Sequence, residues 1–216
     1  MLKLAPMKLA VIANEPQKAA FLKKRLPVYA NVCFVAGPQN IPADTYIVFD
    51  LLYDGTSERI SLLKQFLPRP VFINAVTDTL ASIDQPFIRI NAWPGFLQRE
   101  ITEVAVMPAQ ETSIAGVFQE LNWNYVIVAD VAGMVSARLI AMMVNEAYYT
   151  LQESVSSRKE IDTAMLLGTH LPYGPFEWSE RIGLKNICSL LLLLNKENGL
   201  YEVSTLLKQE ALQTNL

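Results

Sequence analysis

The hydrophobic pattern changes character near Asp130, and this change limits the chain to a two-part fold. Before it, short apolar runs such as 8–13 and 46–52 alternate with amphipathic stretches such as 57–66, which predicts strands that alternate with helices. The other runs expected to be strands are 31–36, 71–74, 86–91, 101–106 and 124–128. Helical crossovers between strands build a mostly parallel, doubly wound sheet. We therefore predict a Rossmann-like α/β domain over residues 1–129.

After Asp130 almost no strand pattern remains. Apolar residues recur at helical spacing over 131–151, and Ser157 with Glu160 has the S-x-x-E spacing of a capping box. Further helices are expected at 157–167, from Pro175 to Gly183, at 185–197 and at 203–212. Leucines 190–194 make one helix apolar all round, and a second copy of the chain is the natural cover for such a helix. We predict an all-α dimerisation domain over residues 130–216, with a homodimer formed through its helices.

Composition excludes several classes of function. The net charge is −3, and the most basic segment is the short run Lys23–Arg25, so we expect no nucleic-acid partner. The two cysteines, Cys33 and Cys188, are flanked by apolar residues and are expected to be core thiols in a reducing compartment, with no disulfide and no metal site. The run 187–194 is too short to span a membrane, and residues 1–16 lack the apolar stretch of a secretory signal. We expect a cytoplasmic protein without membrane contact.

Five segments resemble the 3-hydroxyacyl-CoA dehydrogenase family. Residues 130–147 (DVAGMVSARLIAMMVNEA) resemble the family pattern D-x-x-G-F-x-x-N-R followed by N-E-A, at the start of its C-terminal domain. Residues 161–168 (IDTAMLLG) with 172–178 (PYGPFEW) resemble I-D-x-A-M-x-x-G and P-x-G-P-F. Upstream, 89–104 is similar to a strand–loop–strand that ends in a glutamate before valine, and 43–50 to the alanine-aspartate start of another strand. The resemblance covers most of the chain.

This resemblance implies a particular chemistry. Family members hold NAD on a Rossmann-type sheet, dimerise through the helical domain and oxidise 3-hydroxyacyl-CoA in fatty-acid β-oxidation. A histidine takes the hydroxyl proton, an acidic residue orients that histidine, and serine and asparagine hold the substrate oxygen.

The glycine-rich turn that binds the dinucleotide is missing. Glycines let the backbone approach the diphosphate closely, but the G-x-G-x-x-G positions are Ala13, Glu15 and Lys18. Pro16 removes a backbone donor, and Glu15 sets a negative charge against the diphosphate. Gly37-Pro38 stands where an acid is expected to bind the adenosine ribose. We predict that no cofactor is bound, with NAD as the alternative.

The catalytic pair is also altered. Glu103 matches the acidic partner of the family, but Asn91 stands twelve positions upstream of it, where the resemblance implies the histidine. Asparagine does not titrate, and loss of a general base lowers rates by about 10²- to 10⁴-fold. The family asparagine before Arg138 is replaced by Ala137. We therefore expect both Asn91 and Glu103 to be catalytically inactive, with Glu103 more simply explained as a carboxylate at a sheet edge.

Other residues are expected around the remaining cleft. Thr77 and Thr79 correspond to the serine-rich turn of the family and keep hydroxyl groups, while Asp78 adds a charge. Trp93, in a Pro-Gly loop, either lines a pocket or covers the end of the sheet. Arg138 either pairs with Asp130 or caps a helix, and substrate binding is the alternative. Two further features are expected to be structural, namely the turn at His170 and the helix entry 174–178, whose aromatics fill the core.

Three functions remain open at this point. The first is a family member without hydride transfer that acts as a binding or assembly module for acyl-CoA or an enzyme partner. The second is an active NAD-dependent 3-hydroxyacyl-CoA oxidoreductase with divergent site residues. The third is a different acid–base chemistry that uses the carboxylates Glu103, Asp78 and Asp50.

Overall fold

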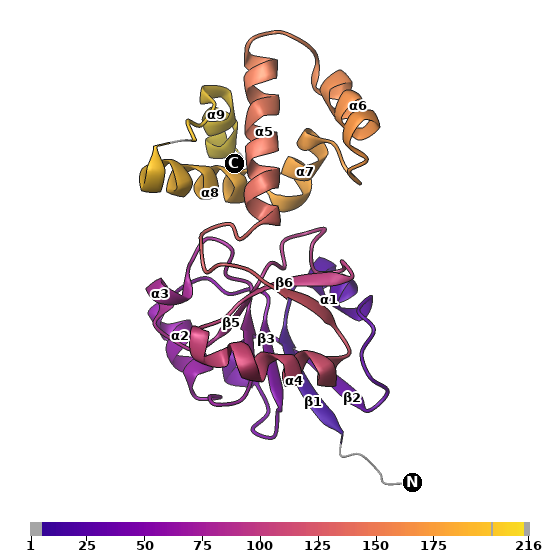
Figure 1. Ribbon diagram of the computed structural model, residues 1–216, viewed down its shortest axis with the longest axis vertical. Helices are drawn as coiled ribbons and strands as arrows, with labels where there is room; N and C mark the ends of the chain where they lie inside the picture. The colour runs from indigo at the N-terminus through magenta and orange to yellow at the C-terminus, as the bar shows by residue number, and fades with distance from the viewer. Residues whose placement is uncertain (1–5, 200, 214–216) are drawn as a thin grey trace. The chain divides into compact units, whose positions relative to one another are not determined.

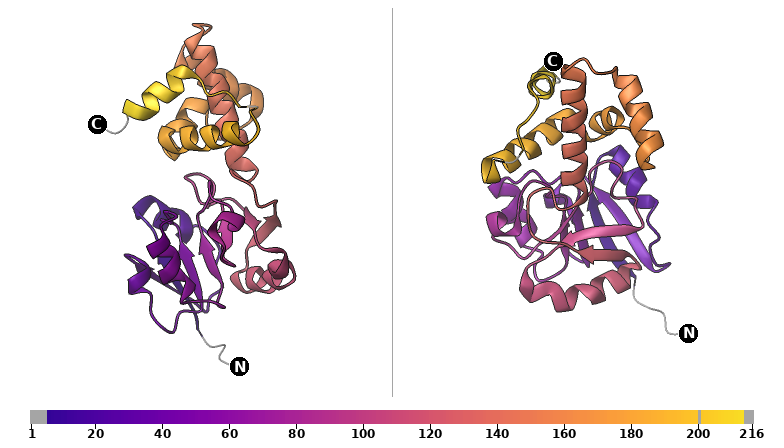
Figure 2. Two further views of the ribbon diagram at one scale, coloured as in Figure 1. Left: turned by 90° about the vertical axis from the view of Figure 1, so that its left-hand side faces the viewer. Right: turned by 45° about the horizontal axis from the view of Figure 1, so that its top comes forward.

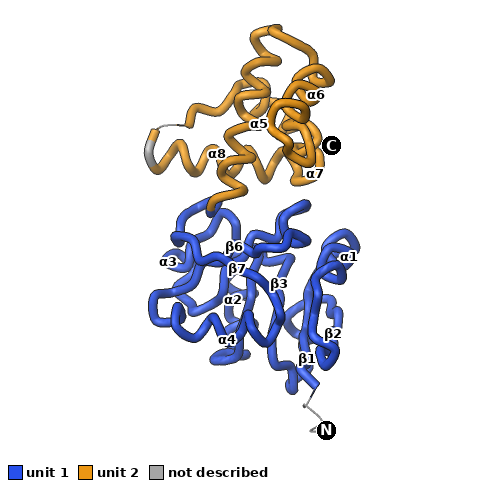
Figure 3. Tube along the Cα trace, turned by 45° about the vertical axis from the view of Figure 1, so that its right-hand side comes forward, with its two compact units in different colours: residues 1–134 blue, residues 135–216 orange. Residues whose placement is uncertain are grey.

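The computed structural model describes residues 6–199 and 201–213, so the first five residues of the N-terminal segment discussed above lie outside it. The chain forms two compact units, Met1–Met134 and Val135–Leu216 (Figure 3). Each unit is described by itself. Residues 130–134 remain with the first unit because Asp130 accepts a hydrogen bond from the Leu80 amide and the Gly133 amide donates to the Val76 carbonyl.

The first unit is built on one seven-stranded sheet with the order β2-β1-β3-β4-β5-β6-β7 (Figure 1). The strands are β1 (Met7–Ile12), β2 (Ala30–Val35), β3 (Ile47–Asp50), β4 (Val71–Ile73), β5 (Ile88–Ile90), β6 (Ile101–Ala105) and β7 (Asn124–Ile127). Neighbouring strands are parallel except for β5 and β6. The segment 91–100 between them contains no helix, and a parallel connection needs a crossover. The predicted Rossmann-like, mostly parallel sheet is confirmed.

Helices cover both faces of this sheet. They are α1 (Glu15–Leu22), η1 (Pro38–Asn40), α2 (Ser57–Lys64), α3 (Leu80–Ile83), η2 (Pro108–Gln110) and α4 (Glu111–Leu121). Phe21 of α1 and Phe118 of α4 lie in one core cluster with Phe49 and Phe72 of the strands. Residues of α2 and α3 pack in a second cluster on the other face. Alternation along the strands supplies both clusters, because successive side chains point to opposite faces.

The second unit consists of helices around a central α5 (Figure 2). Its helices are α5 (Ser136–Gln152), α6 (Arg158–Thr169), α7 (Pro175–Ile182), α8 (Leu184–Asn198) and α9 (Thr205–Gln213). The long helix was expected from residue 131 but begins at Ser136, because Gly133 and Met134 have φ angles of 78° and 49°, which interrupt a helix. Likewise, α6 passes Gly168 and ends with His170 in the left-handed conformation.

A short network explains two of the family-like motifs in this unit. The Asp162 carboxylate accepts hydrogen bonds from the amides of Phe176 (2.8 Å) and Glu177 (3.2 Å), at the start of α7. Backbone amides at a helix start need such an acceptor. A Cβ atom at Gly174 would lie 2.4 Å from Asp162 Cγ, so only glycine allows this approach. Phe176 and Trp178 are buried, which confirms that the aromatics of this helix fill the core.

The leucine run is covered more fully by its own unit than the sequence suggested. Leu190, Leu191 and Leu194 are buried within the chain, and Leu192 is exposed. The expectation that this helix needs cover on every side from a second copy is therefore wrong for three of its leucines. Leu192, which is 46% exposed, is not covered by its own unit.

Cys33 is exposed on β2, so its assignment to the core is wrong, whereas Cys188 is buried as expected. Strand β2 is one of the two outermost strands of the sheet, and its position there decides the exposure of Cys33. Both thiols are free, and the described residues contain no group of three His, Cys, Asp or Glu side chains placed to hold a metal ion. Within the same residues, every helix is too short or too polar to cross a membrane.

Candidate functional site

The turn after β1 is where a Rossmann-type sheet binds the diphosphate of a dinucleotide, because the helix that follows offers free amides. Here two of the amides in this turn, those of Asn14 and Gln17, are bound within the turn. Asn14 Oδ1 accepts from the Gln17 amide at 3.0 Å, and Gln17 Oε1 accepts from the Asn14 amide at 3.1 Å. Gln17 Nε2 also donates to the Leu51 carbonyl at 2.8 Å, which ties the turn to the end of β3. The result is a closed capping box.

Charge in the same turn also disfavours an anion. Pro16 has no amide hydrogen, and the carboxylate of Glu15 is 85% exposed in front of the helix start. Lys18 Nζ lies 2.6 Å from Glu15 Oε1, so the nearest cation is already paired. The residues of this turn therefore do not fit the diphosphate of NAD.

A buried ion pair fills the carboxyl end of β3. Asp50 is fully buried and receives two hydrogen bonds from Arg59 of α2, from Nε at 2.6 Å and from Nη2 at 2.7 Å. Its Oδ1 also accepts from the Leu52 amide at 3.1 Å. Burial raises the pKa of the Asp50 carboxyl, and the hydrogen bonds from Arg59 oppose that shift. Asp50 is thus committed to Arg59 and is no longer a free carboxylate for acid–base work.

A second arginine, fully buried, orders the loops after β4 and β5. Arg89 is fully buried on β5, donates to the Ala75 carbonyl at 2.9 Å and forms an ion pair with Asp130. Asp130 in turn accepts from the Leu80 amide at 3.0 Å, at the start of α3. Asp130, one of the partners expected for Arg138, is therefore engaged by Arg89. Arg138 itself lies on α5 in the helical unit, where it is half-buried.

The threonines of the predicted cleft have different roles. Thr79 is the N-cap of α3, and its hydroxyl accepts from the Ser82 amide at 3.2 Å. Thr77 and Asp78 are half-buried beside it. A Cβ atom at Gly55 would lie 3.0 Å from Asp78 Oδ2, so the loop after β3 packs closely against this acidic residue. The structure thus brings Asp78 to the loop that follows Asp50.

Asn91 lies at the end of β5 and is only 4% exposed. Its Oδ1 accepts from the Trp93 amide at 3.2 Å, while its Nδ2 is buried without a hydrogen-bond partner among the described residues. Asn74 holds the same loop, because its Oδ1 accepts from the Ala92 amide at 2.9 Å. Trp93 and Phe96 are both buried, which agrees with the expectation that this loop covers the end of the sheet. The side chain of Asn91 can therefore donate a hydrogen bond, but it has no group that could take up a proton.

Glu103 is half-buried on β6, opposite Val126 of β7. Because β6 lies between β5 and β7, the interpretation of Glu103 as a carboxylate on an edge strand is wrong. The antiparallel β5–β6 pair joins Ile90 to Val104, the residues next to Asn91 and Glu103. The two family positions therefore lie on adjacent strands.

Sequence reasoning missed the groups that close this site. The Asn14-x-x-Gln17 spacing is itself a capping-box signal and was available from the sequence. Arg59 and Arg89 carry no local signal, because their partners are far along the chain or on another element. Sequence reasoning also missed Tyr53 near this site. Burial and the nearby carboxylates of Asp78 and Asp54 raise the pKa of the Tyr53 phenol to about 12.

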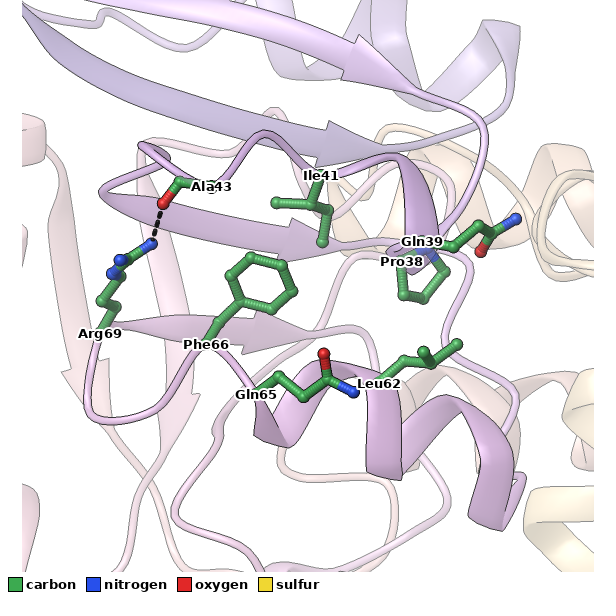
Figure 4. Close-up of a pocket in the computed structure, with 8 residues that line it drawn as sticks. All are labelled: Pro38, Gln39, Ile41, Ala43, Leu62, Gln65, Phe66 and Arg69. Carbon is green, nitrogen blue, oxygen red and sulfur yellow. Dashed lines mark hydrogen bonds between the residues drawn. The ribbon is translucent and has the colours of Figure 1, made fainter.

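A pocket of about 360 Å³ lies elsewhere on this unit, between the segment that contains η1 and helix α2 (Figure 4). Its lining residues are Pro38, Gln39, Ile41, Ala43, Leu62, Gln65, Phe66 and Arg69. Arg69 Nη1 donates to the carbonyls of Ala43 (2.7 Å) and Thr45 (2.9 Å), which precede β3. Its cation is therefore already bound by the backbone. In open α/β sheets ligands bind outside the carboxyl ends of the strands, and this arginine lies at their amino ends.

Similarity to known proteins is concentrated in the helical unit. The family profile of the 3-hydroxyacyl-CoA dehydrogenase C-terminal domain matches residues 133–211. The 3-hydroxyadipyl-CoA dehydrogenase of Escherichia coli K12 is 39% identical over 115 residues, which are 52% of this chain and 24% of that protein. The 3-hydroxybutyryl-CoA dehydrogenase of Bradyrhizobium diazoefficiens is 34% identical over 95 residues, 44% of this chain and 31% of that protein. The matched region thus spans about a quarter to a third of these curated relatives.

The fold extends the similarity to the whole chain. The crystal structure of (S)-3-hydroxybutyryl-CoA dehydrogenase from Ralstonia eutropha superposes with a TM-score of 0.70 at 17% identity, over 97% of this chain and 95% of that one. At this identity the likeness concerns the fold alone. The profile match and the motifs show that the helical unit, over residues 133–211, belongs to the 3-hydroxyacyl-CoA dehydrogenase C-terminal domain family, and the α/β unit shares the fold of the solved dehydrogenase.

Proposed function

We propose that this chain is a family member without hydride-transfer activity that acts as a binding or assembly module linked to acyl-CoA metabolism. The observation that carries the proposal is the closed turn after β1. The amides of Asn14 and Gln17 are bound in its capping box, and Glu15 sets a negative charge at the helix start. A diphosphate at this turn would have to break the capping box and lie against a carboxylate.

The catalytic position supports the same proposal. Hydride transfer from a hydroxyl group needs a base that removes the proton as the hydride leaves. Asn91 has only an amide there, and its buried Nδ2 is a hydrogen-bond donor. A donor of this kind suits the binding of a carbonyl oxygen and does not suit the removal of a proton. Trp93, Thr77 and Thr79 are then loop and cap residues of a binding site, and Glu103 has no proton relay to complete.

We further propose that the chain forms a homodimer through its C-terminal helices and works in the cytoplasm, with acyl-CoA or an enzyme of that metabolism as its partner. Large apolar side chains remain exposed at Val135, directly before α5, at Leu139 of α5 and at Leu192 of α8. Burial of such residues against a second copy is favourable, at about 25 cal/mol per Å² of apolar surface. Arg138, beside Leu139, is a candidate contact for an acyl-CoA phosphate.

A panel of thermal denaturation curves tests this function. A ligand at about 100 times its dissociation constant adds about 2.7 kcal/mol of stability, which corresponds to a shift of roughly 5–10 °C for a chain of this size. We expect such a shift with acetoacetyl-CoA or free CoA and none with NAD or NADH. A clear shift with NADH would refute the proposal and support an active oxidoreductase. No shift with any compound would remove acyl-CoA as the ligand and leave the enzyme partner.

A matched variant distinguishes the two proposed reasons why NADH does not bind, namely the charge of Glu15 and the capping box. Glu15→Gln removes the charge and leaves the Asn14–Gln17 capping box intact. We expect this variant also to show no shift with NADH, because its helix amides remain bound. If Glu15→Gln gained NADH binding, charge alone would be the barrier and the argument from the capping box would fail.

A further inference from the structure

Strand β2 is one of the two edges of the sheet, and β7 is the other. Within residues 6–199 and 201–213, the only strand partner of β2 is β1 (Figure 1, Figure 3). Its six residues, ANVCFV, contain no charge and no proline. Natural proteins protect exposed edges with lysines, prolines, bulges or very short strands, because a free edge pairs readily with another chain. This edge has none of the sequence safeguards.

One face of β2 is also uncovered. Val32 and Phe34 point toward the core cluster that contains α1, so Asn31 and Cys33 point to the opposite face. Both are exposed there and border a hollow of about 260 Å³. The ion pair of Lys8 with Asp44 also borders this hollow.

We infer that this edge binds the same edge of a second copy, with the two β2 strands antiparallel about a twofold axis. Helix α1 lies over β2, as the Phe21 and Phe34 rings are 6.3 Å apart and Lys18 Nζ is 5.7 Å from the Phe34 ring. This helix starts with the acidic Glu15 and is followed by the exposed cations Lys23 and Arg25, while Lys24 between them is buried and donates to the Arg99 carbonyl. A twofold axis reverses the second helix, so the acidic end of one copy meets the basic end of the other. The edge is therefore complementary to itself in charge as well as in backbone hydrogen bonds.

The geometry of antiparallel pairing limits the register. In an antiparallel pair, two residues directly opposite each other are either both hydrogen-bonded or both non-hydrogen-bonded. One residue of β2 must therefore lie opposite the same residue of the second copy, with the twofold axis between the two. In β2 the two central choices are Val32 and Cys33. With Cys33 on the axis, the two Cα atoms lie about 4.5–5.5 Å apart. With Val32 on the axis, the two cysteines are diagonal neighbours about 7–8 Å apart. Either register brings the two exposed thiols within reach of a short bis-maleimide.

Oligomer mass and cross-linking of the full chain test this interface. Cys33→Lys places like charges across the axis at an exposed position, and we expect it to halve the mass of a closed wild-type assembly measured by light scattering. Cys33→Thr, which is uncharged and suited to a strand, is the control and should keep the wild-type mass. The variant Cys188→Ala, with Cys33 as its remaining thiol, should give a covalent dimer with a short bis-maleimide.

Equal masses for the wild type and Cys33→Lys would overturn the inference, as would the absence of a covalent dimer in Cys188→Ala at micromolar concentration. Circular dichroism checks that the lysine variant is folded. If it is not, Asn31→Lys offers the same charge at a second exposed position of the same strand, and the same halving is expected.

Discussion

Removal of the Arg59 side chain should strongly destabilise the α/β unit. Asp50 is fully buried, and Arg59 is the cation that binds both of its oxygens. In Arg59→Met the carboxylate loses that partner while it remains out of water. Breaking a buried ion pair by deleting one member costs about 3–5 kcal/mol. We expect a loss of that size in urea denaturation at about pH 7, where free carboxyl groups are ionised.

A double variant and a surface control make this prediction specific. Asp50→Asn combined with Arg59→Met removes both charges, and it should recover most of the loss, since a neutral pair leaves no buried ion. Arg181→Met breaks an exposed pair with Glu177 within one helix, and it should cost no more than about 0.5 kcal/mol. A loss below about 1 kcal/mol for Arg59→Met, or a double variant as unstable as the single one, would refute the reasoning.

The stability lost in Arg59→Met should also depend on pH, in a direction that follows from the pKa of Asp50. Burial raises the pKa of Asp50 above its usual value of 3.8, so the folded state binds the proton more readily than the unfolded state. Stability from this group is therefore lost as pH rises through the window above 3.8, and it is regained as pH falls. Without Arg59 the pKa rises further, because the hydrogen bonds that oppose the shift are gone. The deficit of Arg59→Met against the wild type should thus shrink at about pH 4.5, and a deficit that grows there would contradict this assignment.

Three further predictions concern other contacts. Gly174→Ala forces a Cβ atom against Asp162 and should destabilise the helical unit by about 1–3 kcal/mol in urea denaturation. Gly168→Ala is the control, because the space around Gly168 is open, and it should be neutral or stabilising by up to about 1 kcal/mol. Equal effects of the two substitutions on stability would argue against the clash at Gly174. Burial lowers the pKa of Lys24 from 10.5 to about 8, so the unfolded state binds more protons between these values and stability should rise with pH in that window. The rise should be absent in Lys24→Met, and a persistent rise would assign it to another group. Asn14→Ala should lower stability by about 1 kcal/mol through loss of the helix cap, and no measurable loss would mean that the capping box is not formed in solution.

Much of the fold was predictable because its signals are local. Short apolar runs placed all seven strands of the sheet, and the division into an α/β part and a helical part followed from the loss of that pattern. The four-residue helix Leu80–Ile83 was missed, since it is too short to show a helical period. The antiparallel direction of β6 depends on a loop without a helix, and its position between β5 and β7 is a property of the whole sheet.

The sequence alone shows which family residues are missing from the site, but it does not show which residues occupy the site instead. Missing glycines and the missing histidine are visible residue by residue. By contrast, Arg59 and Arg89 became part of the site only because folding brings Asp50 and Asp130 to them. Cys33 was misassigned for a related reason, since apolar neighbours in sequence do not show that a strand lies at an edge.

Binding of NADH to the full chain is the most direct test of the central claim that the closed turn after β1 excludes the dinucleotide. Isothermal titration calorimetry at low salt measures it without any need for catalysis. The closed capping box and the charge of Glu15 predict no saturable heat, which corresponds to a dissociation constant weaker than about 1 mM. A saturable one-to-one binding curve in the micromolar range, with crystallographic density for the diphosphate along residues 13–18, would contradict the claim.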